Sequence, residues 1–468
     1  MVSRLSQKAI ESWASLGPRF LPFADVATRE LPLSRLLRLS LFQVSVGMAL
    51  VLLIGTLNRV MIVELAVPAS LVGIMISLPL VFAPFRAVIG FRSDNHTSAL
   101  GWRRVPYIWK GTMLQFGGLA VMPFALLVLA GQGQASQAPI WIGHLGAGIA
   151  FLMVGAGLHT VQTVGLALAT DLAPVEAQPK VVGLMYVMLL LGMIVSAIAF
   201  GAALSNFSPG RLIQVIQAAA VLTLILNVTA MWKQESRRRG QANQPRPQAS
   251  FAQSWDAFVK GEHAVRRLVV VGFGTMGFAM ADVLLEPFGG QILKLAVADT
   301  TMLTAALALG GLTGFGLASR VLSRGADPFR MAALGALVGI PAFGAVILSA
   351  SLLSAVPFAV GTLLIGFGAG LFGHGTLTAT MNLAPKGQAG LALGAWGAVQ
   401  ASAAGIAIAL GGIIRDVIAG ADFSAAWPAA TGYTIVYSLE ILFLFLAIAV
   451  MLPVLGHRTI GVVREERA

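Results

Sequence analysis

Long apolar runs recur along almost the whole chain, and they constrain its fold more than any other feature. A membrane-spanning helix needs about 20 mostly apolar residues. The runs here are continuous rather than alternating, so they predict helices and not barrel strands. Hydrophobic residues are 57% and charged residues 11% of the 468, which excludes a soluble enzyme, a disordered chain and a nucleic-acid binder. The sequence has no cysteine, so disulfides and thiolate metal sites are excluded.

Twelve runs are predicted to span the membrane, six on each side of a long polar connection. The chain is therefore predicted to be an all-α membrane protein of twelve transmembrane helices in two six-helix pseudo-repeats, the major facilitator fold. The predicted spans are 36–57, 69–91, 105–130, 140–169, 181–204, 209–232, 267–290, 299–321, 329–350, 355–381, 388–414 and 428–453.

The predicted domains follow from these spans. Residues 1–35 form an N-terminal segment with an amphipathic helix in the membrane interface, and 36–232 form the first bundle. A basic linker at 233–265 carries a second amphipathic helix. The second bundle is 266–453, and 454–468 is a tail.

The basic residues are distributed very unevenly between the two sides of the predicted membrane. The net charge is +12, from 31 Lys and Arg against 19 Asp and Glu. If both termini are cytoplasmic, nearly all the basic residues fall on the cytoplasmic side, as the positive-inside rule expects. The exceptions are Arg59, Arg211, Lys294 and Arg415 on the other side and Arg86 within the second span.

The two halves of the chain resemble each other. Span four ends GAGLHTVQTVGLALATDLAP (155–174), and span ten ends GFGAGLFGHGTLTATMNLAP (366–385). Aligned without gaps, the two stretches share glycines and the closing Leu-Ala-Pro, and Asp171 corresponds to Asn382. Repeated halves with a binding space between them are typical of transporters, although chance similarity between simple apolar helices is the alternative.

Two short patterns have competing interpretations. GFGTMG at 272–277 matches the dinucleotide-binding pattern, but it lies inside an apolar span, where close helix packing explains its glycines better. The connection after span two contains Gly90, Asp94, Arg103 and Arg104. An acid and two guanidiniums at a helix junction could latch one helix to another by charge-assisted bonds, or the arginines could serve only as cytoplasmic anchors.

Ionisable and strongly polar groups inside a membrane are costly, so each is a functional candidate. For the cluster near the outer ends of spans one and seven, Arg59 pairing with Glu286 or Asp282 as a structural lock is one hypothesis. Glu440 is expected to be a protonated carboxyl bonded within the bundle. The predicted intramembrane polar network is Asn58, Arg59, Glu64, Arg86, Asp282, Glu286 and Glu440.

Two histidines are candidates for binding a metal held in a large planar ring. His159 in span four and His374 in span ten lie at similar depth in glycine-rich helices. Neutral imidazole is a good axial ligand, and missing side chains would leave flat walls beside such a ring. The alternative is that each histidine is bonded to a neighbouring helix.

No catalytic triad, zinc-protease pattern or paired catalytic carboxylates are apparent, so neither an enzyme nor a protein-ligated metal site is predicted.

Several stretches resemble the PucC/LhaA family of phototrophic bacteria, the bacteriochlorophyll delivery branch of the major facilitator superfamily. The resemblance runs from about residue 20 to 455. It is carried by LFQVSVGMALVLLIGTLNRVMIVEL (41–65), SDNHTSALGWRRVPYIWKG (93–111), MADVLLEPFGG (280–290) and NLAPKGQAGLALGAWGAVQA (382–401).

The resemblance implies an assembly factor for light-harvesting antenna complexes in the bacterial inner, photosynthetic membrane. The distribution of basic residues predicts that both termini are cytoplasmic. The resemblance also implies bacteriochlorophyll as a transient cofactor and antenna α/β polypeptides as partners. Pigment-synthesis enzymes or the reaction-centre core complex are further possible partners. The assignment of pigment binding to the histidines is our own hypothesis. The alternatives are a proton-coupled secondary transporter and a membrane chaperone scaffold that binds no pigment.

Overall fold

The computed structural model describes residues 31–81, 89, 92–93, 98, 101–131, 133–174, 178–235, 264–382, 389–420 and 428–453. All of the secondary structure in these ranges is helical. In the first half the elements are α2 (Leu33–Leu39), α3 (Leu41–Leu50), η2 (Val51–Leu57), η3 (Val60–Glu64), α4 (Ala69–Val81), α6 (Val105–Leu129), η4 (Gly133–Gln137), α7 (Ile140–Leu172), α8 (Gln178–Ala203) and α9 (Pro209–Met231).

The second half has the same plan. Its elements are α11 (Ala264–Ala279), η6 (Met280–Val283), α12 (Leu285–Gln291), α13 (Val297–Leu322), α14 (Pro328–Leu352), α15 (Ala355–Asn382), α16 (Ala389–Ala419) and α17 (Thr431–Met451).

The predicted twelve-helix architecture is confirmed. Eleven of the described helices are long and apolar enough to cross a membrane, and Ala69–Leu80 is a shorter apolar helix. This shorter helix is the start of the predicted second span, 69–91, which the structure describes continuously only as far as Val81. The predicted interfacial helix within 1–35 and the amphipathic helix of the 233–265 linker lie outside the described residues. Because apolar side chains cover the outside of the helices, this is a multi-pass membrane protein.

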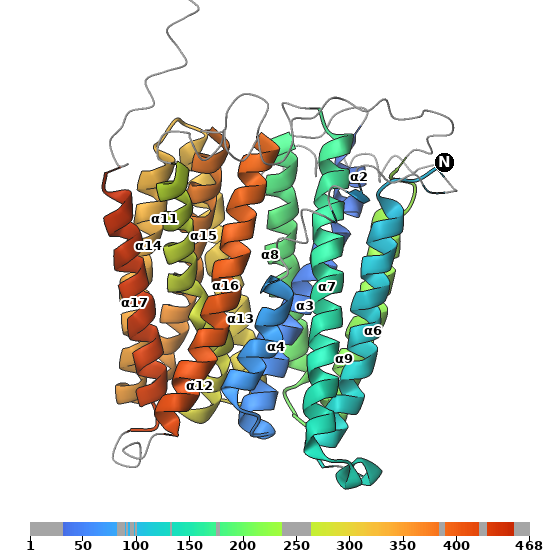
Figure 1. Ribbon diagram of the computed structural model, residues 1–468, viewed down its shortest axis with the longest axis vertical. Helices are drawn as coiled ribbons and strands as arrows, with labels where there is room; N and C mark the ends of the chain where they lie inside the picture. Colours follow the sequence, from blue (N-terminus) through green and yellow to red (C-terminus); the bar gives the residue numbers. More distant parts are fainter. Residues whose placement is uncertain are drawn as a thin grey trace, which may run out of the picture.

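The helices form two bundles that stand side by side (Figure 1). In that view α2 and the end of α17 lie at one end of the molecule, which we call the upper end. The 3-10 segment η4 and helix α12 lie toward the opposite end, which we call the lower end. Two helix pairs connect the bundles, α4 with α16 and α8 with α13. Small residues permit these contacts: a Cβ on Gly412 would lie 2.4 Å from the backbone oxygen of Ala69.

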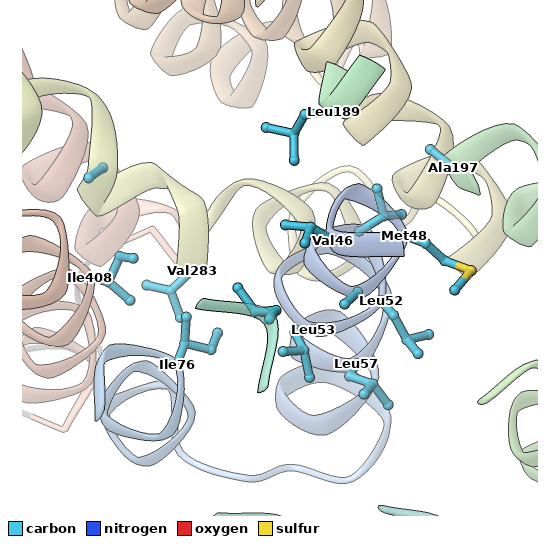
Figure 2. Packing of buried hydrophobic residues seen from close by; sticks show 14 of the residues in the cluster. Val46, Met48, Leu52, Leu53, Leu57, Ile76, Leu189, Ala197, Val283 and Ile408 are labelled. Atoms are coloured by element: carbon cyan, nitrogen blue, oxygen red, sulfur yellow. The ribbon is translucent and has the colours of Figure 1, made fainter. Parts of the chain in front are cut away.

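The first span lies at the centre of the apolar core. Figure 2 shows Val46, Met48, Leu52 and Leu57 of this span, with Val283 and Ile408 of the second half in the same view. Burial of such side chains is complete, with Leu52 and Leu57 at 0% exposure. The interface between the halves is thus a packed apolar contact at this level.

Spans one and seven depart from regular α-helix. Span one was predicted to end at residue 57, but its helical backbone continues to Glu64 through two π-helical segments, η2 and η3. Span seven is interrupted by the 3-10 segment η6 before it resumes as α12. Single-turn π-helical distortions are often found at functional sites, and here both irregular segments face each other across the two bundles.

Candidate functional site

Asn58 connects the irregular part of span one to the break in span seven. Its amide nitrogen donates hydrogen bonds to the carbonyl oxygens of Val283 at 3.1 Å and Asp282 at 3.3 Å. The same nitrogen lies 2.9 Å from the carbonyl oxygen of Ile54 on its own helix. The 3-10 segment leaves backbone groups without their usual helical partners, and a buried carbonyl needs a donor. Asn58, in the first bundle, therefore supplies a hydrogen-bond donor to the carbonyl oxygens at the break in span seven.

Glu440 supports the same break from within the second bundle. Its carboxyl Oε1 accepts a hydrogen bond from the backbone N–H of Ala281 at 2.7 Å, and the side chain is fully buried. The predicted role as a carboxyl bonded within the bundle agrees with this contact. Asp282, one residue further on, is only partly buried.

Arg59 is buried at 3% exposure, but its ion pair differs from the predicted lock. Its guanidinium pairs with Glu64 of the same span, at 2.5 Å, rather than with Glu286 or Asp282. A π-helix brings residues five apart into register, which places Glu64 beside Arg59. The guanidinium still reaches the second bundle, because it donates a 3.0 Å hydrogen bond to the carbonyl oxygen of Leu295.

Glu286 lies against span one at a glycine. Its Oε1 accepts a hydrogen bond from the Thr304 hydroxyl. A Cβ on Gly55 would lie 2.7 Å from that carboxyl oxygen and 2.8 Å from the Thr304 hydroxyl. The absence of a side chain at Gly55 therefore makes room for the Glu286–Thr304 pair at the boundary between the bundles.

A second polar contact closes the lower end. The Asp416 carboxylate accepts a hydrogen bond from the backbone N–H of Ser70 at 2.7 Å and pairs with Arg415 at 2.8 Å. Arg415 also donates to Gln291, as does the Tyr433 hydroxyl, at 2.5 Å and 2.6 Å. From the sequence, Arg415 is predicted only as a basic residue on the outer side, and this network is not predicted. The adjacent acid at the end of span eleven was the available signal.

We call the polar contacts that join the two bundles in the lower half the lower clamp. They bring together three predicted residues, Asn58, Arg59 and Glu286, and add five that were not predicted. The lower clamp consists of Asn58, Arg59, Gly55, Glu286, Thr304, Leu295, Ser70 and Asp416.

At the upper end, the two predicted loop arginines form a latch within the first bundle. Asp171, at the end of α7, accepts hydrogen bonds from both Arg103 and Arg104, the latter at 3.0 Å. Arg104 also donates to the Ser93 hydroxyl at 2.6 Å. The carboxylate of Glu235 accepts hydrogen bonds from the backbone N–H groups of residues 103–105, where α6 begins at Val105.

These contacts use the arginines in charge-assisted bonds rather than as anchors alone. Three predicted members of this region and of the polar network, Arg86, Gly90 and Asp94, lie outside the described residues. Asp171 and Glu235 were not predicted as latch partners, because a lone carboxylate at a helix end carries no sequence pattern that names its partner.

The two candidate histidines lie in different bundles. His374, on α15, packs against Phe315 of α13 in a tilted arrangement, with ring centroids 4.2 Å apart and an interplanar angle of 54°. The Phe315 ring lies 6.3 Å from the Tyr186 ring of α8. Three rings thus extend from α15 to the first bundle in the upper half of the molecule. The Nδ1 atom of His374 is buried without a hydrogen-bond partner among the described residues. His159 is half-buried on α7.

The prediction that the glycines beside the histidines form flat, open surfaces is mostly wrong. A Cβ on Gly368 would lie 2.7 Å from the backbone oxygen of Gly335, and one on Gly370 would lie 2.5 Å from that of Gly311. These glycines permit close helix packing and leave no flat open surface. Gly373 is the exception near His374, since a Cβ there would meet nothing within 4 Å.

The GFGTMG stretch is part of the transmembrane helix α11, as the packing interpretation predicted. A Cβ on Gly274 would collide with the Phe372 ring at 1.9 Å, and one on Gly277 with Leu444 at 2.8 Å. Gly272 makes only an ordinary contact with Val399.

Two six-helix bundles joined by paired helices define a membrane protein of the major facilitator type. A solved structure of the same fold is a bacterial homologue of the iron transporter ferroportin in its inward-facing state. It has a TM-score of 0.64 and 14% sequence identity, and covers 90% of this chain and 98% of that chain. A bacterial homologue of the lysosomal transporter Spinster, also inward-facing, has a TM-score of 0.61 and 14% identity over 90% of this chain and 97% of that chain.

Sequence comparison identifies the family within that class. Residues 56–459 match the family described as PUCC protein. Protein PucC of Rhodovulum sulfidophilum is 66% identical over 89% of this chain and 92% of its own length. Protein PucC of Cereibacter sphaeroides is 59% identical over 97% and 98%. The chain belongs to the PucC family.

A more distant relative carries a name that mentions pigment. The bacteriochlorophyll synthase 44.5 kDa chain of Rhodobacter capsulatus is 28% identical over 89% of this chain and 94% of its own length. With the other relatives, it places this chain among photosynthesis-related membrane proteins.

Proposed function

We propose that this protein is an assembly factor for light-harvesting antenna complexes, and that it binds or delivers bacteriochlorophyll to antenna α/β polypeptides within the photosynthetic inner membrane. The observation that carries the proposal is the match to the PucC family across residues 56–459. The name of the Rhodobacter capsulatus relative, a bacteriochlorophyll synthase chain, supports the pigment part. No chemical step is proposed for the protein itself.

Within this function, His374 is the better of the two candidate pigment ligands. An axial ligand for magnesium needs an imidazole nitrogen that is not already bonded, and the Nδ1 of His374 meets that condition. Phe315 lies against the imidazole, and the neighbouring Gly373 leaves open space. A single nitrogen ligand with apolar surroundings would hold a pigment weakly enough to release it. His159 remains the second candidate.

The surface of the bundles suits partners that are themselves membrane helices. Large apolar side chains are exposed along the lipid-facing sides, among them Phe124 at 69%, Val195 at 64% and Trp141 at 60% exposure. Antenna α/β polypeptides are the proposed partners, with pigment-synthesis enzymes or the reaction-centre core complex as further ones. Both termini are proposed to be cytoplasmic, because the basic residues gather on the side where the chain begins and ends.

The experiment that tests antenna assembly is a chromosomal deletion in a phototrophic host, complemented with this chain. We expect antenna absorption bands to be lost on deletion and restored by the wild-type chain, while the reaction-centre and pigment-synthesis genes stay intact. Normal antenna levels in the deletion strain would contradict the proposal. Affinity purification of the complementing chain should also recover antenna polypeptides. Recovery of these polypeptides without pigment would favour the pigment-free scaffold.

A proton-coupled transporter is the second candidate, and one observation favours it. The lower clamp joins the two bundles by a limited set of polar contacts, which could break and re-form if the halves rock as transporter halves do. Glu286 of the clamp and Glu440 nearby are buried carboxyls, the residue type used in membrane proton relays. Flux driven by a pH gradient in proteoliposomes would establish this function, and antenna loss on deletion with no such flux would exclude it.

A further inference from the structure

A group of polar side chains lies buried inside the first bundle, apart from the lower clamp and the histidines. It comprises Ser45 on α3, Gln115 on α6, and Thr223 and Asn227 on α9, each at 0% exposure. We call these four residues the inner polar cluster. The Ser45 hydroxyl lies 2.6 Å from Asn227 Oδ1, and Gln115 Nε2 donates to the Ser45 carbonyl oxygen at 3.2 Å. Ser45 therefore joins the other two helices.

Three polar atoms of this cluster lack partners. Gln115 Oε1, Thr223 Oγ1 and Asn227 Nδ2 are buried and make no hydrogen bond with the described residues. Thr223 and Asn227 are four residues apart on α9 and so lie on one face of that helix. A buried polar group that has lost water without gaining a partner destabilises the fold. Three such atoms, all on the two helices that Ser45 joins, therefore point to a bound group that satisfies them.

The three atoms match the bonding capacity of one water molecule. Asn227 Nδ2 is a donor, Gln115 Oε1 is an acceptor, and the Thr223 hydroxyl can be either. Water offers two donors and two acceptors, and a buried water typically makes about three hydrogen bonds to polar groups that are otherwise unsatisfied. An ion does not fit, because the cluster contains no charged side chain and offers both a donor and an acceptor.

The cluster is not a by-product of the internal repeat. Two of the three corresponding helices of the second bundle are apolar at this level: residues 331–348 of α14 and 441–451 of α17 contain no side chain that donates or accepts a hydrogen bond. The second bundle also buries polar side chains, among them Tyr437 and Glu440 of α17, but it places none within these two stretches. Ser45 also lies six residues before Val51, where span one changes from α-helix to π-helix.

We infer that the inner polar cluster is a binding site for one buried water molecule, which bridges Gln115, Thr223 and Asn227 and joins spans one, three and six. The site holds span one on its inner side, just above the irregular segment that carries Asn58. It is independent of pigment binding and of antenna assembly.

An experimental structure of the full-length protein, at a resolution that shows ordered water, tests the site directly. We expect density within hydrogen-bonding distance of Asn227 Nδ2, Gln115 Oε1 and Thr223 Oγ1. A dry cluster, in which the amides and the Thr223 hydroxyl bond directly to one another or stay unpaired, would overturn the proposal.

The sign of a stability change gives a second test. Thr223→Val keeps the side-chain shape and removes the hydroxyl. If a water is bound, it loses a partner and the Tm should fall by about 1–3 °C. If the hydroxyl is unpaired, its removal should leave the Tm equal or higher, which would contradict the site. Thr112→Val is the matched control, because Thr112 is equally buried and bonds only to the Ile108 carbonyl oxygen of its own helix, at 2.8 Å.

Discussion

The amide nitrogen of Asn58 lies 3.1 Å from the carbonyl oxygen of Val283, so span one of the first bundle completes the broken helix of span seven in the second. Asn58→Leu keeps the size of the side chain and removes the donor. Two buried carbonyls lose a partner, so the free energy of unfolding should fall by about 2–4 kcal/mol. Thermal unfolding of the purified protein measures this.

The control for that substitution is Ser438→Ala, which removes a hydroxyl bonded to its own helix on an exposed face. Its effect should stay within about 0.5 kcal/mol. If the Asn58 variant were as stable as the wild type, the hydrogen bonds of Asn58 to span seven would make no contribution to the free energy of unfolding.

Gly55 should be intolerant of any side chain. In Gly55→Ala the new Cβ would lie 2.7 Å from the Glu286 carboxyl and 2.8 Å from the Thr304 hydroxyl. Overpacking of this kind costs about 1–3 kcal/mol. Gly344→Ala is the matched control, since a Cβ there meets nothing within 4 Å. Replacing a helical glycine by alanine should raise the free energy of unfolding by about 0.5–1 kcal/mol. If both variants gain stability to the same extent, the packing at Gly55 is looser than described.

Glu440 should tolerate glutamine but not leucine. Glutamine keeps an oxygen that can accept from the Ala281 N–H, whereas leucine leaves that buried donor unpaired. Glu440→Leu should therefore be less stable than Glu440→Gln by about 1–3 kcal/mol. A leucine variant as stable as the glutamine variant would mean that Ala281 does not depend on Glu440.

The latch at the upper end should show coupling between Arg104 and Asp171. A double-mutant cycle with Arg104→Gln and Asp171→Asn should give an interaction free energy of about 1–2 kcal/mol, because the bond is charge-assisted and Arg104 is buried. Arg104→Lys should recover little of it, since lysine cannot contact Asp171 and Ser93 in the same planar geometry. Additive single effects would contradict the latch.

The regular parts of this fold follow from the sequence, and the irregular parts do not. Twelve apolar runs predict twelve helices because hydrocarbon forces every backbone group into internal hydrogen bonds. The same pattern does not distinguish an α-helix from the π-helical segments of span one, since both are uniformly apolar. That ambiguity explains why the Arg59–Glu64 ion pair was not predicted: regular α-helical spacing does not place Glu64 beside Arg59, and the π-helix does.

The candidate sites were predictable to a similar degree. A charged residue inside an apolar run is a functional candidate, and this identifies Arg59, Glu286 and Glu440. Their hydrogen-bond partners depend on how the two halves of the chain pack. Asn58 was predicted as polar, whereas its bonds to the span-seven backbone depend on a 3-10 segment with no composition signal. The glycines near His374 could equally have formed an open wall or a packed contact, and only the placement of the neighbouring helices decides between them.

The most direct test of the central claim is the pigment content of the protein purified from a bacteriochlorophyll-producing host. The wild-type chain should copurify with bacteriochlorophyll, seen in its absorption spectrum, and His374→Leu should lose most of that pigment while Gly344→Ala keeps it. A wild-type protein without bacteriochlorophyll would contradict pigment delivery. Unchanged pigment in a variant that lacks both His159 and His374 would contradict the proposed ligands.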